Sequence, residues 1–314
     1  MPSEATFEAA SNRVMQRSHV LATCTDSEEG LTRLFCSGAM RAAHECFRLW
    51  MSNAGMVVRV DEAGNLIGRR PAAAAGARFV IIGSHLDTVV NAGRHDGTLG
   101  VLIGLALAEV CEEEGIELPV ALDVVGFSEE EGIRYQSPYI GSRAIAGDLG
   151  AGNPLLERLD DEGVRMADAL AGFGCDPSKL GDAAYKPEQV AAFLEPHIEQ
   201  GPVLEQKDLS LGVVTGIAGQ TRASFRFVGE TGHAGTVPMS LRRDPLPTAA
   251  RFVHAVEEAA RRRPGTLATV GRMDVLPNVA NVIPSEVAVR LDLRQVVDDE
   301  REACFVEIHR AAMS

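Results

Sequence analysis

A histidine and two aspartates in the stretch GSHLDTVVNAGRHDG have the types and spacing expected of a metal site. His85 and Asp87 alternate at the end of an apolar run, so they point to the same side of an extended strand. Asp96 follows in a glycine-flanked loop. Imidazole and carboxylate together suit a borderline divalent metal, and Asp87 could accept the remaining ring N–H of His85 or of a neighbouring ligand. Taken alone, this motif is better explained as a polar loop whose side chains hydrogen-bond within the loop. The two further polar clusters of the chain favour a metal site instead.

A second cluster, FSEEEG, places Glu129, Glu130 and Glu131 directly after another apolar run. Three carboxylates at a strand exit repel one another unless a cation neutralises them or one keeps a proton. The cluster is therefore a natural place for a metal ligand beside a general base. The alternative is a solvated charge run, which is the better interpretation of residues 112–114 on a helix face and of residues 28–29, which no buried strand precedes.

A third cluster, EPHIEQGPVLE, puts His197 and Glu199 on one side of an extended segment, with Gln200 adjacent. His233 lies further along, in the loop GETGHAGTVPM. His95, beside Asp96, is expected to shape its loop rather than to bind metal. The remaining histidines occur in helical or surface patterns and are expected to be structural: His19, His44, His254 and His309.

The elements around these clusters predict an α/β fold. After a largely helical segment and two short strands around a turn in residues 56–70, ARFVIIGSHLD and VALDVVGFSEEEG are apolar runs typical of buried strands. The helix GVLIGLALAEVCEEEG between them predicts a right-handed βαβ unit and a mostly parallel sheet. VAAFLEPHIEQ approaches the third cluster as a further strand. Polar residues at the carboxyl ends of such strands are where chemistry gathers.

The pattern changes near Leu211 and predicts a smaller α+β domain. GVVTGIAGQTRASFRFVGE, TLATVGRMDVL and SEVAVRLDLRQV alternate as antiparallel strands do. DPLPTAARFVHAVEEAARRR is an amphipathic helix with proline at its start, and DDEREACFVEIHRAAM begins another helix. The expected domains are therefore residues 1–210, which carry the metal-binding clusters, and residues 211–314.

Composition excludes several classes of partner. The 314 residues carry 44 acidic and 30 basic side chains, a net charge of −14, which argues against nucleic acid and acidic membrane surfaces. No apolar run is long enough for a membrane helix, and the N-terminus has no apolar signal-peptide core. The cysteines are scattered without CxxC pairs, which is typical of a reducing compartment, so a cytoplasmic location is expected: Cys24, Cys36, Cys46, Cys111, Cys175 and Cys304.

The motifs GSHLDT…GRHDG, FSEEEG, GSRAIAG, HIEQGPVLE and GHAGTVPMSLRRDP resemble those of a known family. It comprises the dinuclear-metal allantoate amidohydrolases and N-carbamoyl-L-amino acid hydrolases, within the aminoacylase and carboxypeptidase superfamily. The resemblance runs from about Gly30 to Arg294. It implies a zinc-peptidase-like catalytic domain, with a mostly parallel sheet and helices on both faces, and a smaller α+β lid through which the chain forms a homodimer.

The resemblance also implies a metal-ligand set. His85 corresponds to a ligand of one metal, Asp96 to the bridging carboxylate, and Glu131 and His197 to ligands that a further histidine completes. Two divalent ions are implied, manganese or zinc, with cobalt or nickel as alternatives. In the family the catalytic domain resumes after the lid and supplies that last histidine. Because Ser314 falls within the second lid helix, a truncated product or a fragment of a longer chain is expected.

The remaining roles follow by resemblance. Glu130 matches the general base that deprotonates the bridging water, and Asp87 matches the residue that orients His85. His233 matches the lid residue that reaches the active site of the other subunit and steadies the tetrahedral oxyanion. Gln200 matches a position that faces the substrate. Asn281 and Arg294 match a pair of residues that binds the substrate carboxylate.

The function implied is hydrolysis of linear ureido or amidine C–N bonds in a small substrate that carries a carboxylate. Allantoate, converted to ureidoglycine or ureidoglycolate with release of ammonia and CO2, is the first expectation. N-carbamoyl-L-amino acids are the alternative, since both substrates share a ureido group and a carboxylate, and a dipeptidase-like activity ranks below them. An inactive remnant that acts only as a dimerising module is the rival interpretation from another class.

Overall fold

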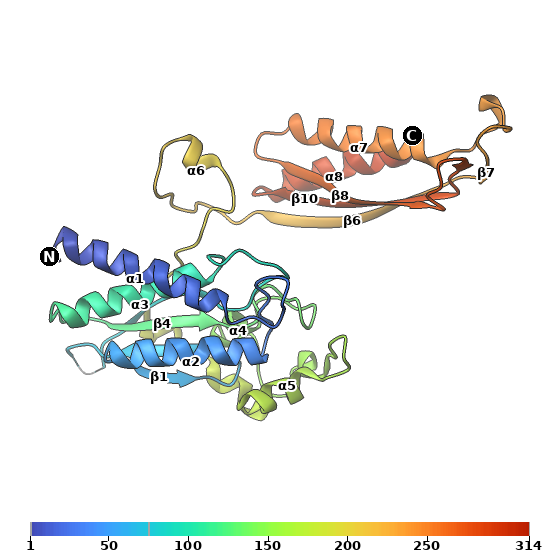
Figure 1. Cartoon of the computed structure of the whole chain (residues 1–314). Coiled ribbons are helices and arrows are strands. Elements are labelled where there is room, and N and C mark those ends of the chain that lie inside the picture. The colour runs from blue at the N-terminus through green and yellow to red at the C-terminus, as the bar shows by residue number, and fades with distance from the viewer. Residues whose placement is uncertain (1, 75, 314) are drawn as a thin grey trace. The chain divides into compact units, whose positions relative to one another are not determined.

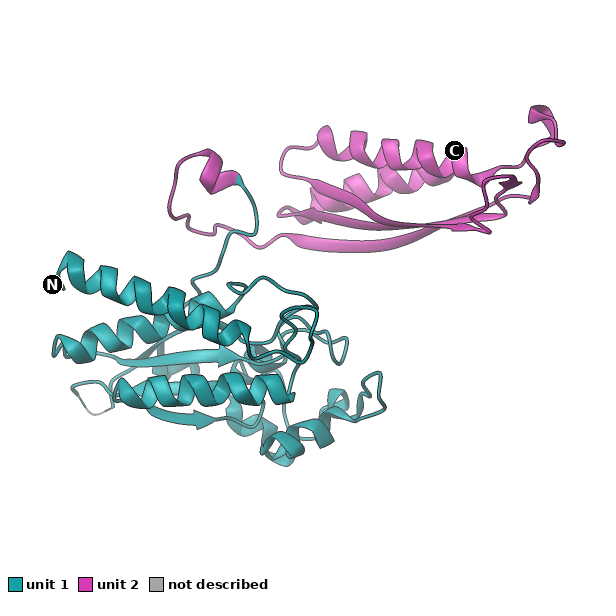
Figure 2. Ribbon diagram, in the orientation of Figure 1, with its two compact units in different colours: residues 1–202 teal, residues 203–314 magenta. Residues whose placement is uncertain are grey.

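The computed structural model describes residues 2–74 and 76–313. The chain divides into two compact units, Met1–Pro202 and Val203–Ser314, which are coloured separately in Figure 2. Each unit has its own sheet and its own apolar core, so each is described by itself.

In the described residues of the first unit, five strands form one mixed sheet in the order β1-β2-β4-β3-β5 (Figure 1). β3 runs parallel to both β4 and β5, whereas β2 is antiparallel to its neighbours β1 and β4. The strand bounds are β1 (Val57–Val60), β2 (Leu66–Arg70), β3 (Phe79–His85), β4 (Ala121–Phe127) and β5 (Val190–Leu194). The α/β sheet and the parallel βαβ unit expected from the sequence are confirmed.

Helices cover both faces of this sheet. On one face, α1 (Glu4–Ala22), α2 (Gly38–Asn53) and α3 (Thr98–Glu113) share an apolar cluster with Leu122 and Val124 of β4. On the other face, alternate residues of the same strands pack against Ile145 at the end of α4 (Ile140–Ile145). The alternation along β4 follows from the period of two in a strand, which sends successive side chains to opposite faces.

A third cluster of the first unit lies between α4 and the segments that lead to β5. Its largest members, Phe35 and Tyr135, meet edge to face with ring centroids 6.0 Å apart. The segments are α5 (Met166–Phe173) and the 3-10 helices η1 (Pro154–Glu157), η2 (Pro177–Ala183) and η3 (Pro187–Gln189). This cluster supports the turns that follow β4 and therefore the glutamates at its end.

The second unit is built on an antiparallel sheet. Three of its strands lie in the order β6-β10-β8, and α7 and α8 pack on one face through a core that includes Phe252, Leu291 and Ile308. β7 and β9 form a separate two-stranded pair. The bounds are α6 (Val203–Gln206), β6 (Gly219–Val228), β7 (Gly232–His233), η4 (Met239–Leu241), α7 (Pro245–Arg261), β8 (Leu267–Leu276), β9 (Val282–Ile283), β10 (Glu286–Gln295) and α8 (Asp298–Met313).

One strand is shorter than the sequence pattern predicts. The alternation was expected to form a strand from Leu211, but β6 begins at Gly219. Its partner β10 ends at Gln295, directly opposite Gly219, so the preceding residues have no neighbouring strand in the described chain. Their apolar side chains are exposed, Val213 by 92%. Alternation alone therefore did not specify a partner for this segment.

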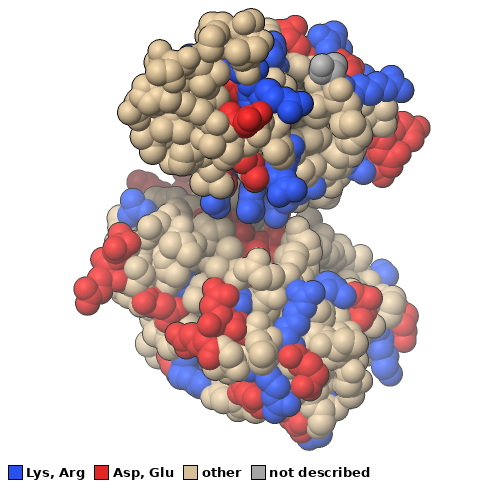
Figure 3. All heavy atoms as spheres, turned by 90° about the vertical axis from the view of Figure 1, so that its right-hand side faces the viewer, with Lys and Arg blue, Asp and Glu red and all other residues tan. Residues whose placement is uncertain are grey.

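Among the described residues, no helix combines the length and apolarity needed to cross a membrane. On the face seen in Figure 3, both acidic and basic side chains are visible on each unit.

Candidate metal centre

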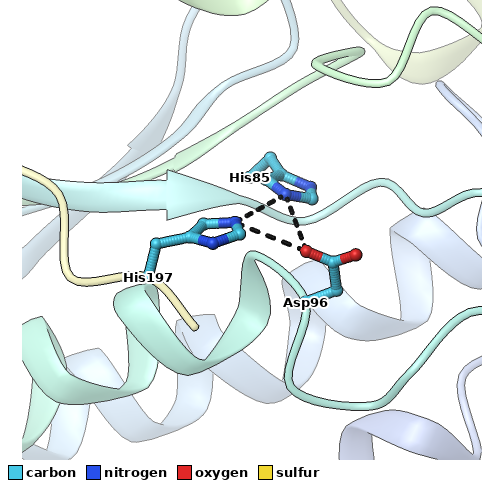
Figure 4. Close-up of side chains that lie close together, drawn as sticks. All are labelled: His85, Asp96 and His197. Atoms are coloured by element: carbon cyan, nitrogen blue, oxygen red, sulfur yellow. Dashed lines mark hydrogen bonds and ion pairs between the residues drawn. The ribbon is translucent and has the colours of Figure 1, made fainter. Parts of the chain in front are cut away.

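Three candidate ligands from separate parts of the first unit converge (Figure 4). His85 is the last residue of β3, Asp96 lies in the loop before α3, and His197 follows β5. The Asp96 carboxylate oxygen Oδ1 is 3.7 Å from Nε2 of His85 and 3.4 Å from Nε2 of His197, and the two Nε2 atoms are 3.5 Å apart. Two imidazole nitrogens facing one carboxylate oxygen form a donor set that fits a divalent metal.

A second group shares His85 and adds Glu130 and Glu131, which follow β4. An oxygen of Glu130 lies 3.9 Å from Nε2 of His85. β3 and β4 are parallel neighbours, with His85 paired to Phe127, so the carboxyl ends of both strands meet at one edge of the sheet. The arrangement therefore has two overlapping groups of candidate ligands that share His85.

A glycine permits the close approach of the Asp96 loop to His85. Gly97 has a φ of 63°, and a Cβ at this position would lie 2.5 Å from the His85 ring. A larger residue would therefore both strain the backbone and displace the imidazole. The glycine beside Asp96 in the sequence is thus required by the packing of the site.

Asp87 contacts the site through both its main chain and its side chain. Its carboxylate, expected to accept a ring N–H of His85 or of a neighbouring ligand, lies 4.0 Å from Nδ1 of His85, and Nδ1 is 2.9 Å from the main-chain carbonyl oxygen of Asp87. The carboxylate accepts hydrogen bonds of 2.9 Å from the main-chain N–H groups of Glu130 and Glu131. The carbonyl thus directs Nε2 of His85 toward the other ligands, while the carboxylate fixes the turn after β4.

The three adjacent glutamates have different environments. Glu129 is buried and accepts a hydrogen bond from the N–H of Tyr135, and burial together with Asp87 raises its pKa to about 8. Burial, with the negative charges of Asp87 and Glu131, raises the pKa of Glu130 to about 6, although His85 opposes the shift. Burial therefore favours the protonated form of Glu129 more strongly than that of Glu130.

The site favours positive charge. Burial lowers the pKa of His85, but the Asp96 carboxylate, 3.7 Å from Nε2, and the charges of Asp87 and Glu130 outweigh burial and raise the pKa to about 9. The proximity of His85 in turn lowers the pKa of Asp96. Carboxylates that stabilise an imidazolium in a buried position would equally stabilise a bound cation in its place.

Gln200 contacts a candidate ligand directly. Its Nε2 donates hydrogen bonds of 2.9 Å to both carboxylate oxygens of Asp96. The substrate-facing role expected for Gln200 stays a prediction, since in this structure its amide orients Asp96.

The acidic residues 112–114 lie away from these ligands, at the exposed end of α3. There they pair with Arg70, Arg13 and Thr6, as expected of a surface charge run.

The expected lid residues lie in two places within the second unit. His233 ends β7, and its Nδ1 accepts a hydrogen bond of 3.0 Å from the N–H of Gly235. Asn281 adjoins β9, the partner of β7, and its carbonyl accepts from the N–H of Ala234. Arg294 lies on β10, where its Nε donates to Asp292 at 2.9 Å. His233 and Asn281 are therefore neighbours, and Arg294 belongs to the larger sheet.

Two residues near the metal centre were not anticipated from the sequence. Glu195 accepts a hydrogen bond of 2.7 Å from the Ser84 hydroxyl and contributes to the raised pKa of Glu130. Arg33 is wholly buried and hydrogen-bonds to both ends of the loop that carries Asp96. The signal for Arg33 was its place in the apolar stretch LTRLFC, where a charged side chain must find buried partners.

Comparison with known proteins identifies the family. The profile of Peptidase family M20/M25/M40 matches residues 81–279. An N-carbamoyl-L-amino acid amidohydrolase from Geobacillus stearothermophilus is 45% identical over 279 residues, covering 89% of this chain and 68% of that protein. An allantoate deiminase from Arabidopsis thaliana is 37% identical over 320 residues, covering 95% of this chain and 61% of that protein.

Solved structures agree. An amidase of the hydantoinase/carbamoylase family from Burkholderia multivorans is 33% identical with a TM-score of 0.87, and its counterpart from Burkholderia ambifaria is 34% identical with a TM-score of 0.84. Both alignments cover 96% of this chain and 73% of the other chain. Across these four relatives the chain spans 61% to 73% of their length. The chain therefore belongs to peptidase family M20, in the group of amidohydrolases that contains the allantoate deiminases and the N-carbamoyl-L-amino acid amidohydrolases.

Proposed function

We propose that the chain is a metal-dependent hydrolase of linear ureido or amidine C–N bonds, with allantoate as its first candidate substrate. The observation that carries this proposal is the convergence of His85, Asp96 and His197, whose candidate ligand atoms lie 3.4 to 3.7 Å apart, with Glu130 beside them. Divalent ions at such a site, zinc or manganese and alternatively cobalt or nickel, polarise a carbonyl and lower the pKa of water.

The ligand assignment uses both groups around His85. Nε2 of His85 and of His197 and the carboxylates of Asp96 and Glu131 would hold the ions, with Asp96 placed between the two imidazoles. Glu130 would take a proton from the attacking water at its carboxylate and return it to the leaving nitrogen. Asp87 positions Glu130 and Glu131 through their main-chain N–H groups.

The second unit supplies substrate recognition in this proposal. Arg294 would bind the substrate carboxylate through two parallel N–H groups, together with Asn281, while Gln200 faces the substrate from the metal site. His233 would donate a hydrogen bond to the oxyanion that develops at the ureido carbonyl oxygen. That role places His233 in the site of a second copy, so a homodimer formed through residues 211–314 is part of the proposal.

N-carbamoyl-L-amino acids are the second candidate substrates. The 45% identity to the Geobacillus N-carbamoyl-L-amino acid amidohydrolase favours them, whereas the motif GHAGTVPMSLRRDP favours allantoate by resemblance. Both compounds present a ureido carbonyl and a carboxylate. The two candidate substrates are therefore distinguished by measuring the turnover of each with the same metal-loaded protein.

The test combines metal content with turnover. The purified chain is loaded with manganese or zinc, its bound metal is measured by elemental analysis, and ammonia release is followed with allantoate and with an N-carbamoyl-L-amino acid. Glu130→Gln should abolish release while metal content stays close to two ions per chain. Glu113→Gln, on the exposed end of α3, is the matched control and should retain activity. One ion or none, with no turnover of either substrate, would contradict the claim that this chain is an enzyme by itself.

A further inference from the structure

Arg33 is a buried cation whose hydrogen bonds go to neutral oxygens. Its side chain has 0% exposure. Within the described chain, its guanidinium donates to the carbonyl oxygens of Leu86 at 2.6 Å, Leu21 at 2.9 Å and Cys24 at 3.1 Å, and to the Thr98 hydroxyl at 3.0 Å. Burying a charge is unfavourable unless its hydrogen bonds are satisfied. Four acceptors thus take up four of its five N–H donors, and two of these acceptors belong to one loop.

That loop carries the candidate metal ligand Asp96. Leu86 directly follows His85 at the end of β3, and Thr98 begins α3 just after Asp96 and Gly97. A single planar guanidinium therefore fastens both ends of residues 86–98. The main chain of the same segment adds further bonds, since the N–H of Ala92 donates to the carbonyl of Leu31 at 2.8 Å.

Arg33 also holds Asp87 from both sides. The residue before Asp87, Leu86, accepts from the Arg33 side chain. The residue after it, Thr88, exchanges two bonds with the Arg33 main chain: its hydroxyl accepts from the Arg33 N–H at 2.8 Å, and its N–H donates to the Arg33 carbonyl at 3.0 Å. Asp87 in turn accepts from the main chain of Glu130 and Glu131. Arg33 thus holds the two residues that flank Asp87, whose carboxylate fixes the turn that carries Glu130 and Glu131.

We propose that Arg33 is a positioning residue that fixes loop 86–98, and through it the geometry of the metal centre. Arginine is required because only its rigid, five-donor fork can reach the two loop ends and the helix carbonyls at once. Lysine carries its three N–H donors on a single ammonium nitrogen. The part of this inference that concerns metal rests on the proposed function, whereas the part that concerns the loop does not.

The test compares Arg33→Lys with the parent chain by two measurements. Hydrogen exchange followed by mass spectrometry reports the protection of residues 86–98 without any metal. Titration with Co2+, followed by its visible absorption, reports affinity and ligand geometry. We expect exchange in 86–98 to rise about 10-fold or more while β4 keeps the parent rate, and the Co2+ dissociation constant to rise about 10- to 100-fold, as for other residues that orient metal ligands.

Two further variants separate positioning from general stability. Thr98→Val removes one acceptor with little change of shape and should give a smaller change of the same kind. Met51→Ala removes a buried side chain that packs over Gly68 of β2; it should lower the melting temperature without changing loop exchange or Co2+ affinity.

The outcomes are distinguishable. The inference would be overturned if folded Arg33→Lys and Thr98→Val showed the loop exchange and Co2+ binding of the parent. It would also be overturned if Met51→Ala changed loop exchange and Co2+ binding as much as Arg33→Lys does. If Arg33→Lys does not fold, the same two measurements on Thr98→Val test the inference. If the parent chain itself binds no Co2+, the proposed metal function fails, and the exchange rates alone decide the role of Arg33.

Discussion

The carboxylate of Asp87 accepts a hydrogen bond of 2.9 Å from the main-chain N–H of Glu130. This bond joins the ends of β3 and β4, because Asp87 follows one strand and Glu130 the other. The proposed general base is therefore positioned by a residue two places after the candidate ligand His85. Asp87 is 1% exposed, so its two acceptor oxygens have no competing solvent.

Asp87→Asn should weaken both the fold and the metal centre. The amide keeps the size of the side chain but replaces one acceptor with a donor that faces the N–H of Glu130 or Glu131. We expect a loss of about 1–3 kcal/mol in the free energy of unfolding and a 10- to 100-fold weaker affinity for Zn2+. Urea denaturation and competition with a chromogenic chelator measure the two effects.

The matched control for Asp87→Asn is Asp160→Asn. Asp160 also accepts from two main-chain N–H groups, those of Glu162 and Val164, but in a turn outside the metal centre. The variant Asp160→Asn should be less stable than the parent, with an unchanged affinity for Zn2+. Equal losses of affinity in both variants would show that the effect of Asp87 is not local.

His197→Ala should remove the stabilisation that metal gives to the fold. A ligand that binds only the native state, present at about 100 times its dissociation constant, stabilises by about 2.7 kcal/mol. We therefore expect a chelator to lower the melting temperature of the metal-loaded parent but not that of His197→Ala. Because the His197 side chain is 29% exposed, the metal-free variant should melt close to the metal-free parent. His254→Ala, on the exposed side of α7, should respond to the chelator like the parent.

The strand ends that carry the ligands could be predicted from the sequence for a physical reason. A strand buried on both faces is an unbroken apolar run, so the polar residue that ends it is conspicuous, as at His85 and Glu130. Parallel neighbours then bring these residues to one edge of the sheet. Periodicity also predicted α7 and the alternating strands β8 and β10, because each buries one face only.

Other features could not be read from the pattern because they depend on tertiary partners. Whether the His85 ring bonds to the carbonyl or to the carboxylate of Asp87 is decided by how the chain turns after β3. Residues before Gly219 alternate like a strand, but no neighbour in the described chain pairs with them. Arg33 is far from the clusters in sequence, and its four acceptors come from separate segments of the first unit.

Arg294→Gln should raise KM for substrates that carry a carboxylate. A charge-assisted hydrogen-bond pair contributes about 1.5–3 kcal/mol, which corresponds to roughly a 10- to 100-fold increase in KM, with a smaller effect on kcat. Steady-state ammonia release measures both constants. Arg226→Gln is the control, since Arg226 lies on β6, the strand next to β10, and pairs with Glu286. Equal KM values for Arg294→Gln and the parent would remove Arg294 from the substrate site.

His44 should make the chain sensitive to acid. Its ring is 3% exposed on α2, packs edge to face against Phe173 at 5.2 Å, and its Nε2 has no hydrogen-bond partner among the described residues. Burial, with nearby arginines, lowers its pKa from 6.5 to about 3. The unfolded chain therefore binds a proton below pH 6.5 that the folded chain does not, so stability is complete above pH 6.5 and falls as the pH drops toward 3.

Replacing His44 by phenylalanine isolates this effect. The variant keeps an aromatic ring against Phe173 and loses no hydrogen bond at Nε2, so at pH 7.5 its stability should be close to that of the parent. Between pH 7.5 and pH 5 the parent should lose about 2 kcal/mol more than His44→Phe, because only the parent gains a proton at this position on unfolding. Urea denaturation at both pH values gives the difference. Parallel losses in the two proteins would mean that other groups dominate the acid response and that His44 is protonated at little expense in the folded chain.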